Sequence, residues 1–233
     1  MLHRISVLTL VTAVLVFLAG CDTTDTDPEP DPIPVPLQTQ MAMDVEADPS
    51  TGGGGGPPTS SGRYTLYDLE TGEVILSSSV TDQTMRAADS SSTAWDIGFN
   101  STTVIVNGGI SGPGQGTAQI VESLFDEVAE APTAGYVTDG NNANCDALLA
   151  VCPGSDNGWY NYNFMTNIVS PLPGRVIVMT TGEGNYAKVR ILSYYQGNPA
   201  DIDPFADPSR YYTFEYIVQP DGSRGFETTT EGL

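Results

Sequence analysis

Short runs of alternating apolar and polar residues, separated by turn residues, dominate the chain from Arg63 onward and predict β-strands. The longest run is 186–195, where one face would be apolar and the other amphipathic. Glu70-Thr-Gly72 lies between the first two runs and predicts a β-hairpin. The other strands are expected at 63–68, 73–76, 94–99, 102–106, 175–180, 211–218 and near Gly225-Phe226. Together these runs predict a mostly β domain that is antiparallel and either sandwich-like or an open barrel.

One segment shows helical rather than alternating spacing. Five apolar residues recur there with the period of an amphipathic helix: Ile120, Val121, Leu124, Phe125 and Val128. We therefore expect one short helix over 118–130 in the β domain, with Pro132 limiting its extension.

The first 21 residues have the pattern of a secretory signal peptide: a basic start, an apolar run from Ile5 to Leu18, and small residues before Cys21. The apolar run is well short of the roughly 20 residues that span a bilayer, so an uncleaved transmembrane helix is the weaker interpretation. Leu18-Ala-Gly-Cys21 resembles the lipobox of bacterial lipoproteins. The resemblance implies cleavage of residues 1–20 and acylation of Cys21. An ordinary signal peptide with an incidental cysteine is the alternative.

Residues 21–62 predict a disordered tether between this anchor and a domain over 63–233. Acids, threonines and prolines alternate up to Pro36, and a glycine run occupies 52–56. Such sequences favour an extended chain and offer few large apolar groups to bury.

The net charge excludes two classes of partner. Without the leader, seven basic and 29 acidic residues remain, a net charge of −22. Nucleic acids and anionic lipid surfaces are polyanions, so we expect the domain to bind neither.

Two cysteines remain beyond the anchor, and they lie in a long segment over 133–158 that is rich in glycine and asparagine. In an oxidising compartment, Cys145 and Cys152 are most simply a disulfide that closes a short loop. A metal site is the weaker interpretation, because two thiolates without histidine make an incomplete ligand set.

The sequence lacks recognisable catalytic machinery. The only histidine, His3, is lost with the leader, and no Gly-x-Ser-x-Gly motif occurs. Lys188 falls in the middle of a predicted strand, where we expect an exposed side chain. The glycine-rich segment 107–116 lacks the Gly-Lys-Ser/Thr ending of a phosphate loop and predicts a loop only. We therefore expect a binding protein rather than an enzyme.

Several motifs, taken in order, resemble the HmuY family of haem-binding lipoproteins. They are Trp95–Phe99, Asn107–Gly116, Gly158–Tyr162, Gly184–Arg190, Ser193–Tyr195, Tyr212–Tyr216 and Asp221–Ser223. Together they cover most of residues 64–226. The resemblance implies a predominantly β fold, a lipid anchor in the outer membrane, and delivery of captured haem to a TonB-dependent receptor.

Characterised haem binders of this kind hold the iron with two histidines, whereas the mature chain has none. Methionine also ligates haem iron. Met165, which follows the aromatic run 159–164, is the iron ligand that we expect, with Tyr160, Tyr162 and Met85 as further ligand-binding residues. Packing is the alternative role for Met165. Met41 and Met43 fall in the predicted tether, and Met179 falls in a strand pattern typical of the core.

We therefore expect an exported, lipid-anchored outer-membrane protein that captures haem, or a haem-like apolar ligand, for uptake. The alternative is a structural or adhesive surface lipoprotein with no small-molecule ligand.

Overall fold

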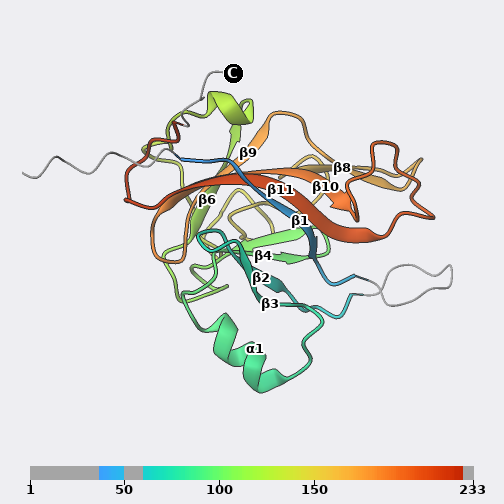
Figure 1. Ribbon diagram of the computed structural model, residues 1–233, viewed down its shortest axis with the longest axis horizontal. Coiled ribbons are helices and arrows are strands. Elements are labelled where there is room, and N and C mark those ends of the chain that lie inside the picture. Colours follow the sequence, from blue (N-terminus) through green and yellow to red (C-terminus); the bar gives the residue numbers. More distant parts are fainter. Residues whose placement is uncertain (1–36, 50–59, 228–233) are drawn as a thin grey trace, which may run out of the picture. The chain divides into compact units, whose positions relative to one another are not determined.

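The computed structural model describes residues 37–49 and 60–227, which form antiparallel sheets with one α-helix (Figure 1). A large sheet has the order β1 (Gln40–Glu46), β11 (Ser209–Gln219), β10 (Tyr186–Tyr195), β9 (Arg175–Thr180) and β6 (Thr117–Glu122). A small sheet has the order β3 (Glu73–Leu76), β2 (Thr65–Asp68), β4 (Ile97–Asn100) and β5 (Thr103–Val106). A separate hairpin joins β7 (Tyr160–Asn163) and β8 (Ile168–Pro171), and the helices are α1 (Gln83–Ser90) and the 3₁₀ turn η1 (Phe125–Glu127). The predicted fold class, mostly β and sandwich-like, is confirmed.

Aromatic side chains hold the two sheets face to face. Tyr212, Phe214 and Tyr216 alternate along β11 and point toward the small sheet. The ring centroids of Phe99 and Tyr212 are 4.4 Å apart. Those of Tyr67 and Phe214 are 5.3 Å apart, in an edge-to-face contact. These contacts form the centre of the core.

The outer face of the large sheet is also covered. Ile217 of β11 packs there with Val176 and Val178 of β9 against Phe125 and Phe226. The two central strands β10 and β11 are therefore buried on both faces, which is why the predicted strand 186–195 lacks a solvated side.

Lys188 lies on this covered face and is only 2% exposed, so the expectation of an exposed lysine is wrong. Its Nζ donates to the carbonyl oxygens of Phe125 at 2.8 Å and Val128 at 3.0 Å, and lies 4.3 Å from the centre of the Phe125 ring. Burial lowers the pKa of Lys188. The lysine thus fastens the turn η1 to the sheet.

The helix expected over 118–130 is wrong. Residues 117–122 form strand β6, and only Phe125–Glu127 make a 3₁₀ turn. Ile120 packs into the core between the sheets, while Val121 packs on the opposite face. Apolar residues on both faces of the strand, followed by Leu124, Phe125 and Val128 beyond its end, imitate helical spacing.

Part of the expected tether is a strand, so the domain starts before Arg63. Residues 40–46 form β1, which pairs antiparallel with β11, and Ala42 and Val45 are buried in the core. The leader, Cys21 and the tether residues 22–36 and 50–59 lie outside the described residues. No helix within the described parts of the chain is long and apolar enough to cross a membrane.

The expected disulfide is wrong as well, because the thiols of Cys145 and Cys152 are free. Burial and the adjacent Cys145 thiol raise the pKa of Cys152 to about 12. The loop is held by hydrogen bonds instead: Nδ2 of Asn142 donates to the Leu149 carbonyl at 2.9 Å and to Sγ of Cys152 at 3.6 Å. Near Gly225 the structure has a single β-bridge to Glu130 rather than the expected last strand.

We predict that Lys188→Met lowers the free energy of unfolding by about 2 kcal/mol, because two buried carbonyls lose their hydrogen-bond donor. Urea unfolding measures the change. Arg175→Met is the matched control, since Arg175 pairs with an exposed Glu122 on the sheet edge and such pairs contribute less than about 1 kcal/mol. A Lys188→Met protein as stable as the wild type would contradict this role of Lys188.

Candidate functional site

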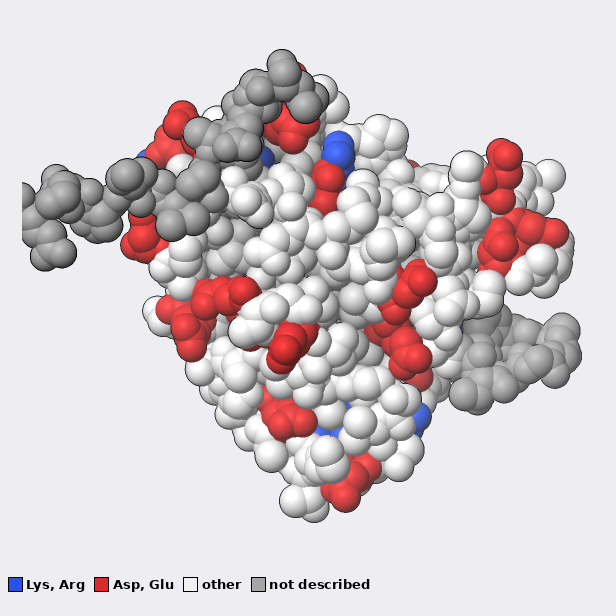
Figure 2. All heavy atoms as spheres, in the orientation of Figure 1, with Lys and Arg blue, Asp and Glu red and all other residues white. Residues whose placement is uncertain are grey.

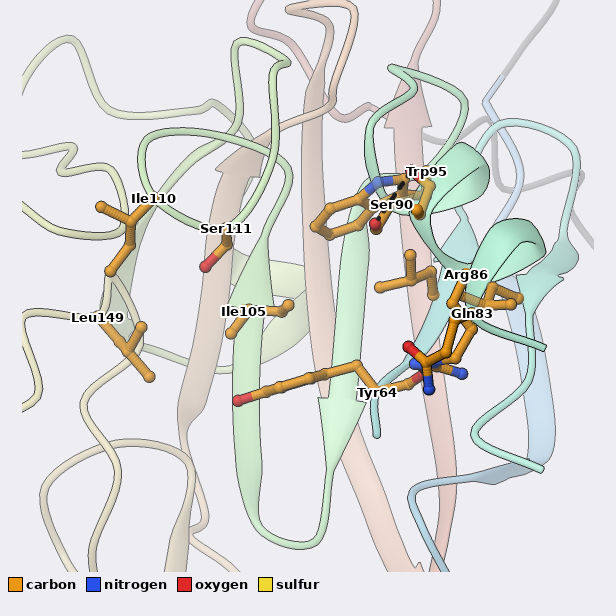
Figure 3. A pocket seen from close by; sticks show the side chains of 12 residues that line it. Tyr64, Gln83, Arg86, Ser90, Trp95, Ile105, Ile110, Ser111 and Leu149 are labelled. Atoms are coloured by element: carbon orange, nitrogen blue, oxygen red, sulfur yellow. Dashed lines mark hydrogen bonds between the residues drawn. The ribbon is translucent and has the colours of Figure 1, made fainter. Parts of the chain in front are cut away.

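A cavity of about 490 Å³ lies on the outer face of the small sheet (Figure 3). Its floor is apolar and is formed by Leu66, Leu76, Trp95 and Ile105. Gly98 lies between Leu66 and Ile105, and a Cβ atom there would come within 2.8 Å of the Ile105 side chain. A glycine at this position lets the two side chains close over the strand and form a continuous apolar surface.

The walls come from elements that are distant in sequence. One wall is α1, which contributes Gln83, Arg86, Ala87 and Ser90. Figure 3 shows Ile110, Ser111 and Leu149, from two loops, on the side opposite α1. The Tyr64 side chain extends from the α1 side toward these loops. The cavity exists only where these three segments are held at the right distance from the sheet.

Asn107 positions the glycine-rich loop 107–116. Its Nδ2 donates to the carbonyl oxygens of Ser92 at 3.0 Å and Trp95 at 2.7 Å, and its Oδ1 accepts from the Gly114 N–H at 3.0 Å. At Gly112, a Cβ atom would lie 2.7 Å from the Trp95 ring, so a glycine is needed for the loop to pass the indole. The glycines of this loop therefore serve close packing beside the cavity.

Asp139 positions the loop that carries Leu149. Its buried carboxylate accepts from the backbone N–H of Val106 at 3.0 Å and of Ala150 at 2.7 Å, and its carbonyl accepts from the Ile110 N–H at 3.0 Å. Burial raises the pKa of Asp139, whereas these donors and the Ser111 hydroxyl lower it. One buried side chain thus ties both cavity loops to the end of β5.

Arg86 attaches α1 to the sheet. No residue of α1 is buried, so the helix has little apolar packing of its own. The Arg86 guanidinium donates to the carbonyl oxygens of Tyr64 at 3.0 Å, Ser77 at 3.1 Å and Val80 at 3.2 Å. Asp82 caps the helix by accepting from two backbone N–H groups of the first turn.

Asp96 links the small sheet to the turn between β9 and β10, directly behind Trp95. Its Oδ1 accepts from the Gly182 N–H at 2.7 Å, and its Oδ2 accepts from the Leu69 N–H at 2.8 Å. Burial outweighs these two donors and raises the pKa of Asp96 to about 7.

The residues expected from the sequence to bind a ligand do not line the cavity. Met165 is 77% exposed and Tyr162 is 42% exposed on the β7–β8 hairpin, where Tyr162 Oη donates to Asn167 Oδ1 at 3.0 Å. Tyr160, on the same hairpin, is buried in the core with its ring 4.9 Å from that of Trp159. Met85 is 54% exposed on α1 and is not among the lining residues.

Sequence reasoning missed the cavity because it missed α1. The signal for this helix was Asp82, a good N-cap residue before a run free of glycine and proline. The structure places Tyr160, Tyr162 and Met165 on or beside the β7–β8 hairpin and Met85 on α1. Whether these residues contact a ligand stays a prediction. Among the described residues, no group of three or more acidic, cysteine or histidine side chains could hold a metal ion.

Comparison with known proteins gives one family match. The sequence profile of the family described as HmuY protein matches residues 61–216. No curated protein matches the chain.

Three of the solved structures that match the chain come from Bacteroides and Tannerella species. An HmuY-like candidate haem-binding protein of Bacteroides vulgatus has 18% identity, with 78% of this chain and 91% of that chain covered, and a TM-score of 0.43. The apo HmuY analog of Tannerella forsythia has 14% identity, 79% and 96% coverage, and a TM-score of 0.40. A candidate lipoprotein of Bacteroides fragilis has 17% identity, 77% and 89% coverage, and a TM-score of 0.40.

We predict that Asp96 makes the protein less stable as the pH rises from about 4 to about 7. The pKa of Asp96 is raised from 3.8 to about 7 by folding, so the folded state keeps a proton in this window that the unfolded chain releases. Urea unfolding across this range compares the wild type with Asp96→Asn, which cannot titrate. The stability advantage of the wild type should shrink with rising pH, by at most about 1.4 kcal/mol per pH unit. An advantage that is constant or grows with pH would refute this assignment.

Proposed function

Because this chain belongs to the HmuY family, we propose that it is a binding protein that captures haem, or a planar apolar ligand like it, in the cavity on the small sheet. The cavity is the observation that carries the proposal. Its volume of about 490 Å³ falls within the range of about 300–1,000 Å³ that is typical of small-molecule sites. Haem is the first ligand to test because the resemblance seen in the sequence motifs implies it.

The cavity suits the ring of haem better than it suits the iron. Its floor is lined by Leu66, Trp95 and Ile105 and is apolar, but none of its lining residues is a histidine, cysteine or methionine. Tyr64 is the one lining side chain of a type that ligates haem iron. Burial and nearby Asp139 raise the pKa of Tyr64, so its phenol stays protonated and is a poor iron ligand at neutral pH. We therefore propose that contact with the ring holds the ligand.

Export and anchoring form the second part of the proposal. The lipobox-like residues before Cys21 support acylation of this cysteine and attachment to the outer membrane. Uptake of the ligand through a TonB-dependent receptor follows from the same family resemblance. No catalytic step is part of the proposed role.

A structural or adhesive role is the second candidate. The β7–β8 hairpin favours it, because Phe164 is 75% exposed and Met165 is 77% exposed at its tip. Apolar side chains exposed this far are typical of protein contact sites when they cluster.

Haem titration of the chain carrying Cys21→Ser, followed by the Soret band, tests where the ligand binds. We predict that Ile105→Trp, which fills the cavity from its floor, weakens binding by about tenfold or more. Ile105→Val keeps the cavity open and is the matched control, with affinity near that of the wild type. Met165→Ala should leave both the affinity and the spectrum unchanged.

Two results would count against this proposal. If Met165→Ala alters the Soret band while Ile105→Trp does not, the site is the β7–β8 hairpin. If the wild type shows only the spectrum of free haem, haem is not the ligand.

We also predict that the wild type, expressed in a bacterial host, incorporates radiolabelled palmitate and sediments with the membranes. Cys21→Ser should abolish both, because the acylated thiol is lost. A wild-type protein that stays unlabelled in the soluble fraction would contradict lipid anchoring.

A further inference from the structure

The charge lining the cavity differs in sign from the charge of the protein. The chain has a net charge of −21, and acidic side chains are spread over the face seen in Figure 2, where lysine and arginine appear at few points. The cavity is lined by one charged residue, Arg86, and by no aspartate or glutamate. An apolar cavity with a single cation in an acidic protein is complementary to an anion attached to an apolar body.

We infer that the cavity selects amphipathic anions, such as molecules with a carboxylate on an apolar body, and that Arg86 binds the anionic group. This inference rests on the proposed function only in taking the cavity as the ligand site. It does not require the ligand to be haem.

The hydrogen bonds of Arg86 leave part of its guanidinium available. Arginine has five N–H donors. Nη1 donates to Ser77 and Val80, and Nη2 donates once, to Tyr64. The Nε–H and one N–H of Nη2 have no acceptor among the described residues. These N–H groups can donate hydrogen bonds to a bound carboxylate.

The positive charge of Arg86 is also not cancelled by an ion pair. Its three partners are neutral carbonyls, which fix its position without neutralising it. The salt bridges in the described residues involve Arg175, Arg190 and Arg224. Burial lowers the pKa of Arg86, as does the nearby Arg63, while Asp48 opposes them.

Two carboxylates that act electrostatically on lining residues, Asp48 on Arg86 and Asp139 on Tyr64, are already bonded. Asp48 accepts hydrogen bonds from Ser61 at 2.6 Å and from Asn100 at 3.2 Å. Asp139 lies behind Ser111, and its carboxylate is bonded to two backbone N–H groups. An anion in the cavity would therefore meet one cation that is held in place and no carboxylate on the lining.

A second, smaller hollow has the opposite charge pattern. It has a volume of about 360 Å³ and is lined partly by Met41, Met43 and Val74, between β1 and β3. Its lining includes Asp44 and Glu46 but no lysine or arginine. An apolar anion would be repelled there, so the two hollows differ in the ligands that they accept.

Two dyes that differ by one anionic group test the inference. 1-Anilinonaphthalene-8-sulfonate and N-phenyl-1-naphthylamine share their rings, and only the first carries a charge. We expect Arg86→Gln to weaken binding of the sulfonate dye by about tenfold, since a charge-assisted hydrogen bond is lost. Loss of the α1 attachment would weaken both dyes alike, so binding of the neutral dye, whose contacts are apolar, should weaken several-fold less than binding of the sulfonate dye. Arg86→Lys keeps the charge and should retain part of the affinity for the sulfonate dye.

Arg175→Gln is the matched control, because it removes the same charge from β9 of the large sheet, away from the cavity lining. It should leave both dyes unaffected. If Arg86→Gln weakens both dyes equally, or neither, the inference is wrong. The haem titration is independent of this result, so the inference and the proposed function can fail separately.

Arg86 also attaches α1, so Arg86→Gln could disturb the fold. A competition experiment on the wild type tests the preference for anions without a substitution. Dodecanoate should displace the neutral dye at a lower concentration than dodecanol does. Equal displacement by the acid and the alcohol would overturn the role of Arg86 without any substitution.

Discussion

Each of the two sheets carries apolar side chains on both faces, and the need to cover the outer faces governs the rest of the structure. The inner faces meet through Tyr67, Phe99 and the aromatic residues of β11. The outer face of the large sheet is closed by η1 and Phe226, with Lys188 bonded beneath them. The outer face of the small sheet is covered by α1 and by two loops, and the space left between them and the sheet is the cavity.

The walls of the cavity are held by polar side chains rather than by apolar packing. Asn107, Asp139 and Arg86 each bond to two or more backbone groups from different segments. A buried polar group that loses its partner costs about 1–3 kcal/mol, so such contacts fix position sharply. The apolar floor can therefore stay open to a ligand without collapse of the surrounding loops.

Much of the β fold could be predicted from the sequence, because strands such as 175–180 and 186–195 have long apolar runs and little turn chemistry. The errors have a common physical origin. Strand β6 has apolar residues on both faces, so its spacing imitates a helix, whereas α1 buries no residue. Strand β1 exposes two methionines and follows a proline-rich segment, so it looks like part of the tether.

The candidate site was harder to predict than the fold. Its lining runs from Tyr64 to Leu149, and these residues meet only because hydrogen bonds over long sequence distances bring them together. The many aromatic residues in the run 159–164 suggested a ligand site there. In the structure, Trp159 and Tyr160 of this run are packed in the hydrophobic core.

The position of the iron in a crystal of the haem complex, located by anomalous diffraction, tests the account most directly. The account predicts that the iron lies between α1 and Leu149, above the floor formed by Leu66 and Ile105. Iron located beside Met165 on the β7–β8 hairpin would contradict it.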